Sequence, residues 1–304
     1  MKQALKAGTR GSRLALWQTD YITATLQGAF PDLVCERTIF TTRGDRILNT
    51  PLPQIGGKGL FTAELEHALR AGVIDIAVHS LKDLPTKNAP GLIIGAVPVR
   101  APVHDVLVAS RRCTLSSLPG GALLGSSSHR RAAQARALRP DLDIRPIRGN
   151  VETRIGKVLD GQYEGTLMAA AGLYRLGLTD HIVEELSFDV MLPAPGQGAL
   201  GVQCREDDDD TLALLGTIES PNTRGATTAE RSFLAALGGG CSTPIAAYST
   251  VTETGHYQMT TLVASTDGEI VIRAEGINAD PEALGKALAE EALAQGAAEV
   301  LAHV

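Results

Sequence analysis

Strand-like and helix-like segments alternate along the first part of the chain, and this alternation constrains the fold more than any other feature. Runs rich in β-branched residues, such as 75–80 (DIAVHS) and 105–110 (DVLVAS), predict strands. Residues 12–30 predict a helix that Ser12 can cap, and residues 60–72 predict another that ends at a glycine. The pattern predicts an α/β fold with largely parallel sheets, in which ligands bind at the carboxyl ends of the strands.

Two segments resemble crossings between lobes. Residues 100–105 (RAPVHD) and 192–207 (LPAPGQGALGVQCRED) interrupt the alternation with prolines. Two crossings predict two α/β lobes with a central cleft. After about residue 218 the pattern changes to a helix, two strands and a final helix at 281–296, which predicts a small α+β domain.

Composition excludes several classes of protein. The chain has 304 residues, 44% of them hydrophobic and 20% charged, which is ordinary for a globular protein with two or three cores. Its four cysteines show no regular spacing, so we expect neither a disulfide framework nor a metal site. We find no secretory signal and no apolar run of about 18 residues, so we expect a cytoplasmic protein without a membrane span.

The net charge of −6 argues against nucleic acid as a partner, but the charge is unevenly distributed. Residues 126–154 contain seven arginines and three acids. A solvated helix face explains Arg136 and Arg139. It explains less well the arginines in the turn-like segments SSSHRR and IRGN, so a binding role stays open for those.

Charged residues follow the apolar strand in the segment IDIAVHSLKDLP, residues 74–85. Such positions form sites in α/β folds. A Lys82–Asp83 surface pair of little energetic value explains them equally well. His79 alone is more typical of a packed core histidine.

Two glycine-rich segments have no regular period. Residues 41–59 form a long stretch rich in Gly and Pro, which favours a mobile lid over a disordered loop. Cys241 follows three glycines in LGGGCSTPI. It can be a buried small hydrophobe, a catalytic thiolate or a covalent attachment point, and the glycines favour the last two because they allow close approach of a ligand.

Taken together, these segments resemble the porphobilinogen deaminase (hydroxymethylbilane synthase) family along essentially the whole chain. The matching segments, in chain order, are GTRGSRLALWQ, TTRGD, GGKGLFTAELE, DIAVHSLKDLP, GSSSHRRAAQ, IRGNVETR, AAAGLYRLGL, LPAPGQGALGVQCR and GGGCSTPI. Each motif alone is weak, but their number and order make the resemblance specific.

The resemblance implies a fold of two periplasmic-binding-protein-like lobes of type II and a small C-terminal domain. One lobe would comprise residues 1–99 with 200–217, and the other residues 100–199. Residues 218–304 would form the α+β domain that carries the cofactor cysteine. The lid would be residues 41–59.

The resemblance also implies an activity in tetrapyrrole and heme biosynthesis. In this family a cysteine holds a dipyrromethane cofactor through a thioether, and Cys241 matches its position. The transferase adds four porphobilinogen units head to tail onto this primer, each with loss of ammonia. Water then releases linear hydroxymethylbilane. The expected partners are therefore porphobilinogen and the growing oligopyrrole, bound by a monomer.

The acetate and propionate arms of the pyrroles make the growing chain a polyanion, which arginine binds bidentately. Asp83 matches the catalytic carboxylate, which would bind pyrrole N–H groups and stabilise the cation left by ammonia loss. The remaining matches are to cofactor-binding residues (Cys241, Lys82, Ser80, Ser126, Ser128, Arg130 and Arg131), substrate-binding residues (Arg10, Ser12, Arg148, Arg154, Arg175 and Gln197) and lid residues (Lys58 and Phe61).

Two alternatives belong to other classes. A non-catalytic carboxylate-binding or effector-sensing protein on the same bilobal fold would need the arginines, but neither Asp83 nor Cys241. A thiol-nucleophile hydrolase would need a histidine base close to Cys241.

Overall fold

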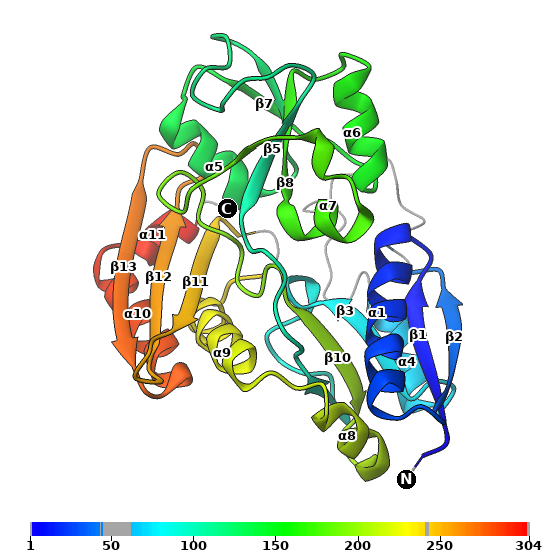
Figure 1. The fold of residues 1–304 in the computed structure, drawn as a ribbon. Helices are drawn as coiled ribbons and strands as arrows, with labels where there is room; N and C mark the ends of the chain where they lie inside the picture. The colour runs from blue at the N-terminus through cyan, green and yellow to red at the C-terminus, as the bar shows by residue number, and fades with distance from the viewer. Residues whose placement is uncertain (1, 43, 45–61, 241–242, 303–304) are drawn as a thin grey trace. The chain divides into compact units, whose positions relative to one another are not determined.

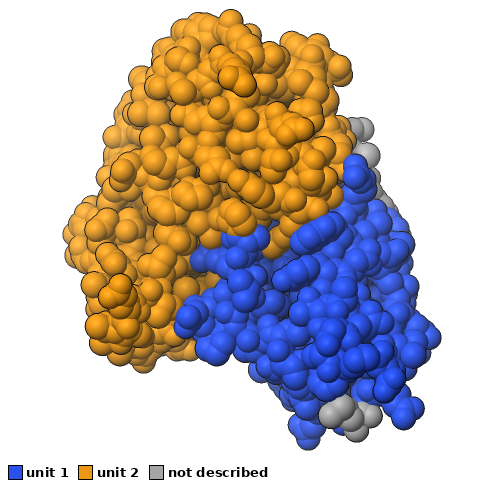
Figure 2. Space-filling view, viewed as in Figure 1, with its two compact units in different colours: residues 1–50, 56–101, 198–224 blue, residues 51–55, 102–197, 225–304 orange. Residues whose placement is uncertain are grey.

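The structure is a computed structural model that describes residues 2–42, 44, 62–240 and 243–302 (Figure 1). The chain divides into two compact units, coloured separately in Figure 2. They comprise residues 1–50, 56–101 and 198–224 in the first unit, and residues 51–55, 102–197 and 225–304 in the second. The sequence-based division into three domains stays a prediction.

The first unit contains a five-stranded sheet in the order β2-β1-β3-β10-β4. Strand β1 pairs in parallel with β2 and β3, whereas β10 runs antiparallel to both of its neighbours. The strands are β1 (Ala4–Arg10), β2 (Val34–Phe40), β3 (Ile76–Ser80), β4 (Leu92–Ala96) and β10 (Leu200–Arg205). The helices are α1 (Arg13–Ala29), α4 (Ala63–Arg70), α8 (Asp209–Gly216) and the 3₁₀ helix η1 (Leu81–Asp83).

Successive residues of β3 pack against different helices, because successive side chains of a strand point to opposite faces. Ile76 packs in one core with Ile22 and Leu26 of α1. Ala77, the next residue, packs in another core with Leu65 of α4. The sheet is therefore covered by helices on both faces, as expected for an α/β unit.

The second unit contains a five-stranded sheet in the order β7-β6-β8-β5-β9. Strand β6 pairs in parallel with β7 and β8, and β5 runs antiparallel to β8 and β9. The strands are β5 (Asp105–Ala109), β6 (Leu123–Gly125), β7 (Asp143–Arg145), β8 (Gly165–Ala169) and β9 (Ile182–Glu185). The helices are α5 (His129–Leu138), α6 (Val151–Leu159), α7 (Ala170–Leu176) and the 3₁₀ helix η2 (Thr179–His181).

The two sheets share one topology. Without the antiparallel strand, the spatial order is β2-β1-β3-β4 in the first sheet and β7-β6-β8-β9 in the second. In both sheets the strands thus follow the chain order second, first, third, fourth, and the antiparallel strand lies between the third and the fourth. That strand is β10 in one sheet and β5 in the other. Strand β5 begins at the last residue of the first predicted crossing, and β10 lies within the second. The predicted class of two α/β lobes is therefore confirmed, although the sequence shows no internal repeat.

The second unit also contains a three-stranded antiparallel sheet in the order β11-β12-β13. Its core contains Phe233, Met259 and Leu284, all buried. The elements around this sheet are β11 (Ile245–Val251), β12 (Tyr257–Ala264), β13 (Val271–Asn278), α10 (Pro281–Ala294), α11 (Ala297–Leu301) and α9 (Pro221–Ala236), of which residues 225–236 belong to the second unit. The predicted α+β arrangement is confirmed. No helix among the described residues combines the length and apolar character needed to cross a membrane.

The first predicted helix is confirmed with its cap, but its exposed face differs from a simple apolar pattern. The Ser12 hydroxyl accepts a hydrogen bond from the backbone N–H of Ala15 at 3.3 Å. Trp17 and Tyr21, which recur at helical spacing, remain more than one-third exposed and stack on each other at 5.3 Å. Smaller residues such as Ala15 and Ile22 face the sheet instead.

Two sequence-based expectations are wrong. The apolar segment GTLMAAAG, residues 165–172, predicts a strand throughout, but β8 ends at Ala169 and α7 begins at the next residue. The run of small residues there lacks the β-branched side chains that favour a strand, and it continues into the helix. The solvated face expected for Arg136 and Arg139 is wrong because both bind backbone carbonyls. Arg136 donates to Thr266 at 2.7 Å, and Arg139 to Ser116 at 2.7 Å.

A charge cluster joins the N-terminal segment to the amino-terminal end of β3 and to α8. Lys2 Nζ lies 2.7 Å from an oxygen of Asp75 and 3.1 Å from one of Asp208, and Arg205 pairs with both carboxylates. Asp208 also caps α8, because its side chain accepts a hydrogen bond from the backbone N–H of Thr211. Burial alone raises the pKa of Asp208, but hydrogen bonds from Thr211 and Lys2 outweigh it and lower that pKa to about 2.

Asp208→Asn should lower the free energy of unfolding at pH 7 but not near pH 2. A carboxylate with a lower pKa in the folded chain stabilises at pH values above its unfolded pKa of about 4. That stabilisation is lost as the pH falls through the folded value of about 2. Urea unfolding at pH 7, 5, 4 and 3 measures the difference from wild type, which should shrink with acidity. The control Asp32→Asn, at an exposed position, should show no such pH-dependent difference. A difference for Asp208→Asn that stays constant with pH would contradict the lowered pKa of Asp208.

Gly285→Ala should destabilise the C-terminal region by about 1–3 kcal/mol, because a Cβ atom there overpacks α10 against α9. That atom would lie 2.4 Å from the carbonyl oxygen of Ala229 and 2.7 Å from the nitrogen of Phe233. Gly156→Ala, in the interior of α6, is the matched control, since no atom lies within 4 Å of its Cβ position. That change should stabilise by about 0.5–1 kcal/mol. Thermal melts of both variants test the contrast.

Candidate functional site

The carboxyl edge of the first sheet gathers the residues predicted from the amino-terminal half of the chain. Strands β1 and β3 are parallel, and the pairing of Gly8 with Ala77 places Arg10 level with His79. Ser12 follows β1 as the cap of α1, and η1 follows β3. The predicted residues at this edge are Arg10, Ser12, Ser80, Lys82 and Asp83.

The local sequence LKDL explains how Asp83 is presented. Leu81 and Leu84 are buried and anchor the two ends of the turn, and the N–H of Leu81 donates to Ala199 at 3.0 Å. Asp83, between them, is exposed. Gly201 permits this packing, because a Cβ there would lie 3.0 Å from side-chain carbons of both leucines. Gly201 is the last glycine of the segment GQGALG, residues 196–201, and it serves close packing. The segment is not a dinucleotide-binding fingerprint, because such a motif is followed by a helix and this one runs into strand β10.

At this edge His79 is buried and Ser80 is half-buried. The hydroxyl of Ser80 accepts a hydrogen bond from Gln18 Nε2 at 3.0 Å. Burial and the charge of Arg10 lower the pKa of His79 to about 4, so its ring is neutral at pH 7. Its Nε2 has no hydrogen-bond partner among the described residues. The interpretation of His79 as a packed histidine is confirmed.

The second sheet has an equivalent edge. Strands β6, β7 and β8 run in parallel and end there, and the antiparallel β5 begins there with Asp105. Ser126 follows β6, and the hydroxyl of Ser128 caps α5 by accepting from Arg131 N at 3.4 Å. The sequence SSSHRR therefore places its serines before the helix and its arginines in the first turn.

Three more predicted arginines lie in or just before the helices that follow β7 and β8. Arg148 precedes α6, whose cap Asn150 accepts a hydrogen bond from Thr153 N at 2.8 Å. Arg154 lies in the first turn of α6, and its Nε donates to Gly149 O at 2.9 Å. Arg175 lies in the last turn of α7. All three arginines are half-buried.

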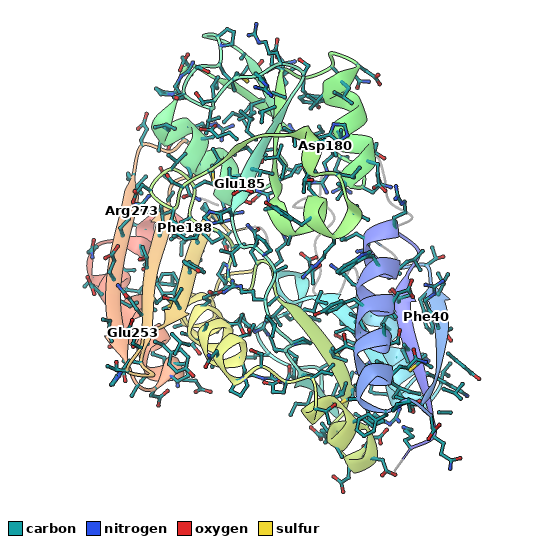
Figure 3. The ribbon with its side chains drawn as sticks, in the orientation of Figure 1. Phe40, Asp180, Glu185, Phe188, Glu253 and Arg273 are labelled. Atoms are coloured by element: carbon teal, nitrogen blue, oxygen red, sulfur yellow. The ribbon has the colours of Figure 1, made fainter. Side chains whose placement is uncertain are left out.

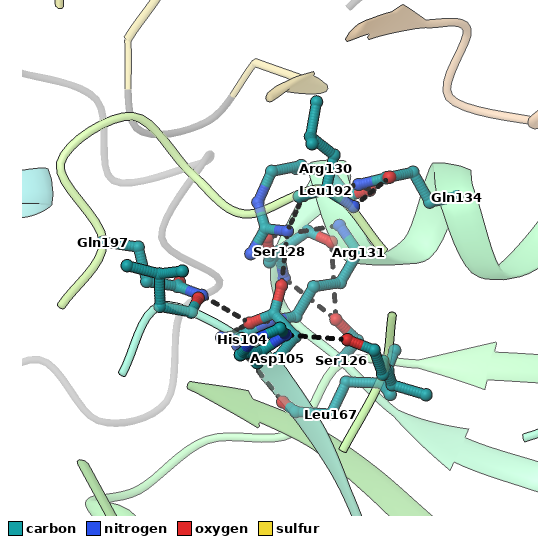
Figure 4. A network of polar contacts seen from close by, with 12 residues as sticks. His104, Asp105, Ser126, Ser128, Arg130, Arg131, Gln134, Leu167, Leu192 and Gln197 are labelled. Carbon is teal, nitrogen blue, oxygen red and sulfur yellow. Dashed lines mark hydrogen bonds and ion pairs between the residues drawn. The ribbon is translucent and has the colours of Figure 1, made fainter. Parts of the chain in front are cut away.

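A buried carboxylate joins three of the predicted residues (Figure 4). Asp105 is fully buried. Its Oδ2 accepts from Arg130 Nη1 at 2.5 Å, and its Oδ1 accepts from Arg131 Nη2 at 2.7 Å and Nε at 3.0 Å. Gln197 Nε2 donates to the same Oδ1 at 2.9 Å and to Val103 O at 2.7 Å. Three predicted ligand-binding side chains thus share one acceptor.

Backbone carbonyls complete this network. Leu192 O accepts from Arg130 Nη1 at 2.6 Å and from Gln134 Nε2 at 3.1 Å, while Leu192 N donates to Gln134 Oε1. Leu167 O accepts from Arg131 Nη1 at 3.1 Å. The arginine heads are therefore fixed by strand β8 and by the segment before Gln197, not only by an ion pair.

The charges in this network set the pKa of its carboxylate. Burial by itself raises the pKa of Asp105, but the charges and hydrogen bonds of Arg130 and Arg131 outweigh burial and hold that pKa well below its ordinary value. Asp105 is therefore ionised at neutral pH. One negative charge then faces two positive ones, which leaves the network able to bind further anionic groups.

Sequence reasoning missed Asp105 and the buried Glu230. Asp105 is the last residue of the predicted crossing, where an isolated acid gave no signal. Glu230 lies in α9, and its carboxylate accepts from Gly196 N at 2.6 Å and Ser249 N at 2.9 Å, so it joins the segment before Gln197 to β11. The only signal for Glu230 was an acid inside an otherwise uncharged helix face.

Three predicted residues lie outside the described residues: Lys58, Phe61 and Cys241. The same holds for most of the predicted lid. On either side of the cysteine, Thr243 N donates to Gly240 O at 3.1 Å, and the Thr243 hydroxyl donates to the same oxygen at 2.7 Å. The other cysteines, Cys35, Cys113 and Cys204, are free thiols.

Comparison with known proteins gives a consistent result over the whole chain. The family model described as "porphobilinogen deaminase, dipyromethane cofactor binding domain" matches residues 5–213, and the model of the porphobilinogen deaminase C-terminal domain matches residues 224–294.

Individual relatives agree. Porphobilinogen deaminase of Brevibacillus brevis is 47% identical over 299 residues, which cover 98% of this chain and 97% of the relative. That of Roseiflexus castenholzii is 48% identical over 303 residues, which cover 99% and 100%. Among solved structures, the periplasmic aliphatic sulphonate binding protein of Escherichia coli aligns with a TM-score of 0.43 at 15% identity, over 77% of this chain and 70% of that one.

A match of this extent decides between the alternatives that the sequence left open. It favours the enzyme over the carboxylate-sensing protein and the thiol hydrolase, and it supports a dipyrromethane cofactor. The chain belongs to the porphobilinogen deaminase family.

Proposed function

We propose that this protein is a hydroxymethylbilane synthase, which condenses four porphobilinogen units head to tail onto a dipyrromethane held by Cys241. Each addition releases ammonia, and hydrolysis releases the linear tetrapyrrole. The full-length family match carries this proposal. The two sheet edges support it with the chemical groups that such a reaction needs.

The donor set of the second sheet edge fits a ligand with several carboxylates. Among the described residues, Arg130 Nε and Nη2 have no hydrogen-bond partner, and each terminal nitrogen of Arg131 keeps one proton without an acceptor. The hydroxyls of Ser126 and Ser128 lie at the same edge. Arginine and hydroxyl donors of this kind bind carboxylates well. When bound, the dipyrromethane supplies the pyrrole end to which the units are added.

The first sheet edge supplies the carboxylate for the chemical step. In that step the bond between the methylene carbon of porphobilinogen and its amino nitrogen breaks, and ammonia leaves. The resulting cation forms a carbon–carbon bond with a pyrrole α-carbon, which then loses its proton. Asp83, exposed between two buried leucines, is a fixed anion that stabilises the cation and can accept a pyrrole proton.

Basic residues beside Asp83 bind the carboxylate arms of the substrate in this proposal. Lys82 lies in η1, which follows β3, and Arg10 lies level with His79 on the neighbouring strand. In the second unit, Arg148, Arg154, Arg175 and Gln197 have the equivalent binding role.

Further parts of the proposal rest on resemblance and composition. The predicted lid, residues 41–59 with Lys58 and Phe61, would cover the substrate. The three-domain division, the monomeric state and the cytoplasmic location belong to the same proposal. A cytoplasmic location is compatible with the free thiols of the described cysteines.

Intact mass tests the attachment of the cofactor. Wild type should exceed its sequence mass by two porphobilinogen units less two ammonias, and Cys241→Ala should lose this excess because it lacks the sulfur that forms the thioether. Cys113→Ala, which removes a half-buried free thiol, is the matched control and should keep the excess. A native spectrum of the same sample should show a single chain. Wild type without excess, even after incubation with porphobilinogen, would overturn the function.

Asp83→Asn should keep the fold and the cofactor mass but lower kcat about a hundredfold or more, because the developing cation loses its fixed counter-charge. Asp180→Asn is the matched control, since Asp180 is also an exposed aspartate in a 3₁₀ helix, η2 (Figure 3). The control should keep wild-type turnover. Near-normal rates in purified Asp83→Asn would exclude a catalytic role.

A further inference from the structure

The two arginines of the second sheet edge are fixed by a single acidic residue. Arg130 and Arg131 are both buried, and Asp105 is their ion-pair partner among the described residues. The first turn of α5 contains no acidic residue of its own. Since a helix N-terminus already favours anions, two adjacent cations at this position need a counter-charge from elsewhere in the fold.

The carboxylate of Asp105 is bound from three sides. Oδ2 accepts from Arg130, and Oδ1 accepts from Arg131 and Gln197. These partners come from α5 and from the segment before β10. The carboxylate therefore has no room to change partner without breaking a buried hydrogen bond.

The hydrogen bonds divide each guanidinium into a bound and an available part. Arg130 uses both protons of Nη1, on Asp105 and Leu192, so that Nε and Nη2 remain. Arg131 uses Nε and one proton each of Nη2 and Nη1, on Asp105 and Leu167. The planar guanidinium is rigid, so fixing one part fixes the direction of the other.

We propose that Asp105 is a positioning residue for the ligand: it holds one part of Arg130 and of Arg131 inside the fold, so that their remaining N–H groups are oriented for the carboxylates of the bound pyrroles. This inference rests on the proposed function. Among the described residues, the side chain of Asp105 accepts from Arg130, Arg131 and Gln197. It acts on the ligand through the two arginines and, in the unliganded protein, it provides their negative charge.

This role has a thermodynamic consequence. Asp105→Asn removes the counter-ion that two buried arginines have among the described residues, which is costly in the protein without cofactor. In the loaded protein the ligand carboxylates supply negative charge to the same guanidinium groups. The stability lost on Asp105→Asn should therefore be larger without cofactor than with it. A residue that only supports the fold would lose the same amount in both states.

The test is a double-mutant cycle of four proteins: wild type, Asp105→Asn, Cys241→Ala, and the two changes combined. Intact mass establishes which proteins carry the cofactor. Melting temperatures at pH 7 should fall more on Asp105→Asn in the Cys241→Ala background than in the loaded protein, by at least about 2 °C. The loaded Asp105→Asn variant should also show a KM for porphobilinogen raised about tenfold with a smaller change in kcat, since misdirected arginines weaken ground-state and transition-state binding alike.

Each outcome of the double-mutant cycle either supports or overturns the proposed role of Asp105. Equal falls in melting temperature with full cofactor mass would overturn the proposal, and so would an unchanged KM. A folded Asp105→Asn protein without the cofactor mass would support it, because the arginines then fail to bind the cofactor. If Asp105→Asn does not fold, Asp105→Glu keeps the charge and moves the carboxylate by one methylene. That variant should load less cofactor or show a raised KM, and wild-type values for both would overturn the proposal.

A matched control separates this effect from a general change of charge. Asp143 lies in the same sheet and pairs with Arg145 at 2.7 Å, but on the surface. Asp143→Asn should change the melting temperature equally with and without cofactor. Wild type without the cofactor mass would instead contradict the proposed function itself, so the two failures are distinguishable.

Discussion

The buried Asp105 carboxylate is the constraint on which the second unit depends most. It lies at the start of the antiparallel strand β5, where the chain enters this unit, and it binds the first turn of α5 and the segment before β10. Removing two guanidinium groups from water is expensive unless charge and hydrogen bonds compensate. The fold provides both, through one carboxylate and the carbonyls of Leu167 and Leu192. As a result, the cationic donors of Arg130 and Arg131 are held rigidly.

The shared topology of the two sheets explains why both carry part of the site. In each sheet three adjacent parallel strands end at one edge, and a capped helix follows one of them. Ser12 and Ser128 have the same structural role as caps, and each stands close to predicted ligand-binding arginines. The chemical character of the edges differs, because the first presents the exposed Asp83 and the second presents buried arginines.

The placement of several candidate residues could be predicted from sequence because they lie at strand ends, whereas their roles came from the family resemblance. Ser80, Lys82 and Asp83 come after an apolar run, and Ser126 and Ser128 come between a strand and a helix. Such placement depends on local sequence and on the parallel pairing that alternation predicts. The solvent exposure of Arg136 and Arg139 could not be predicted in the same way, because their partners are carbonyls of loops distant in sequence.

The sequence by itself determined the α/β class, the caps, the strand ends and, through ordered motifs, the family. Each of these is encoded in residues that are neighbours along the chain. Only the tertiary structure decided that Asp105 binds Arg130, Arg131 and Gln197, and that Glu230 joins α9 to β11 and to the segment before Gln197. These contacts span up to 92 residues of chain, and a single acid carries no mark of a partner so far away. Burial selects the partner, because an ion in the interior must be paired where the fold places a counter-charge.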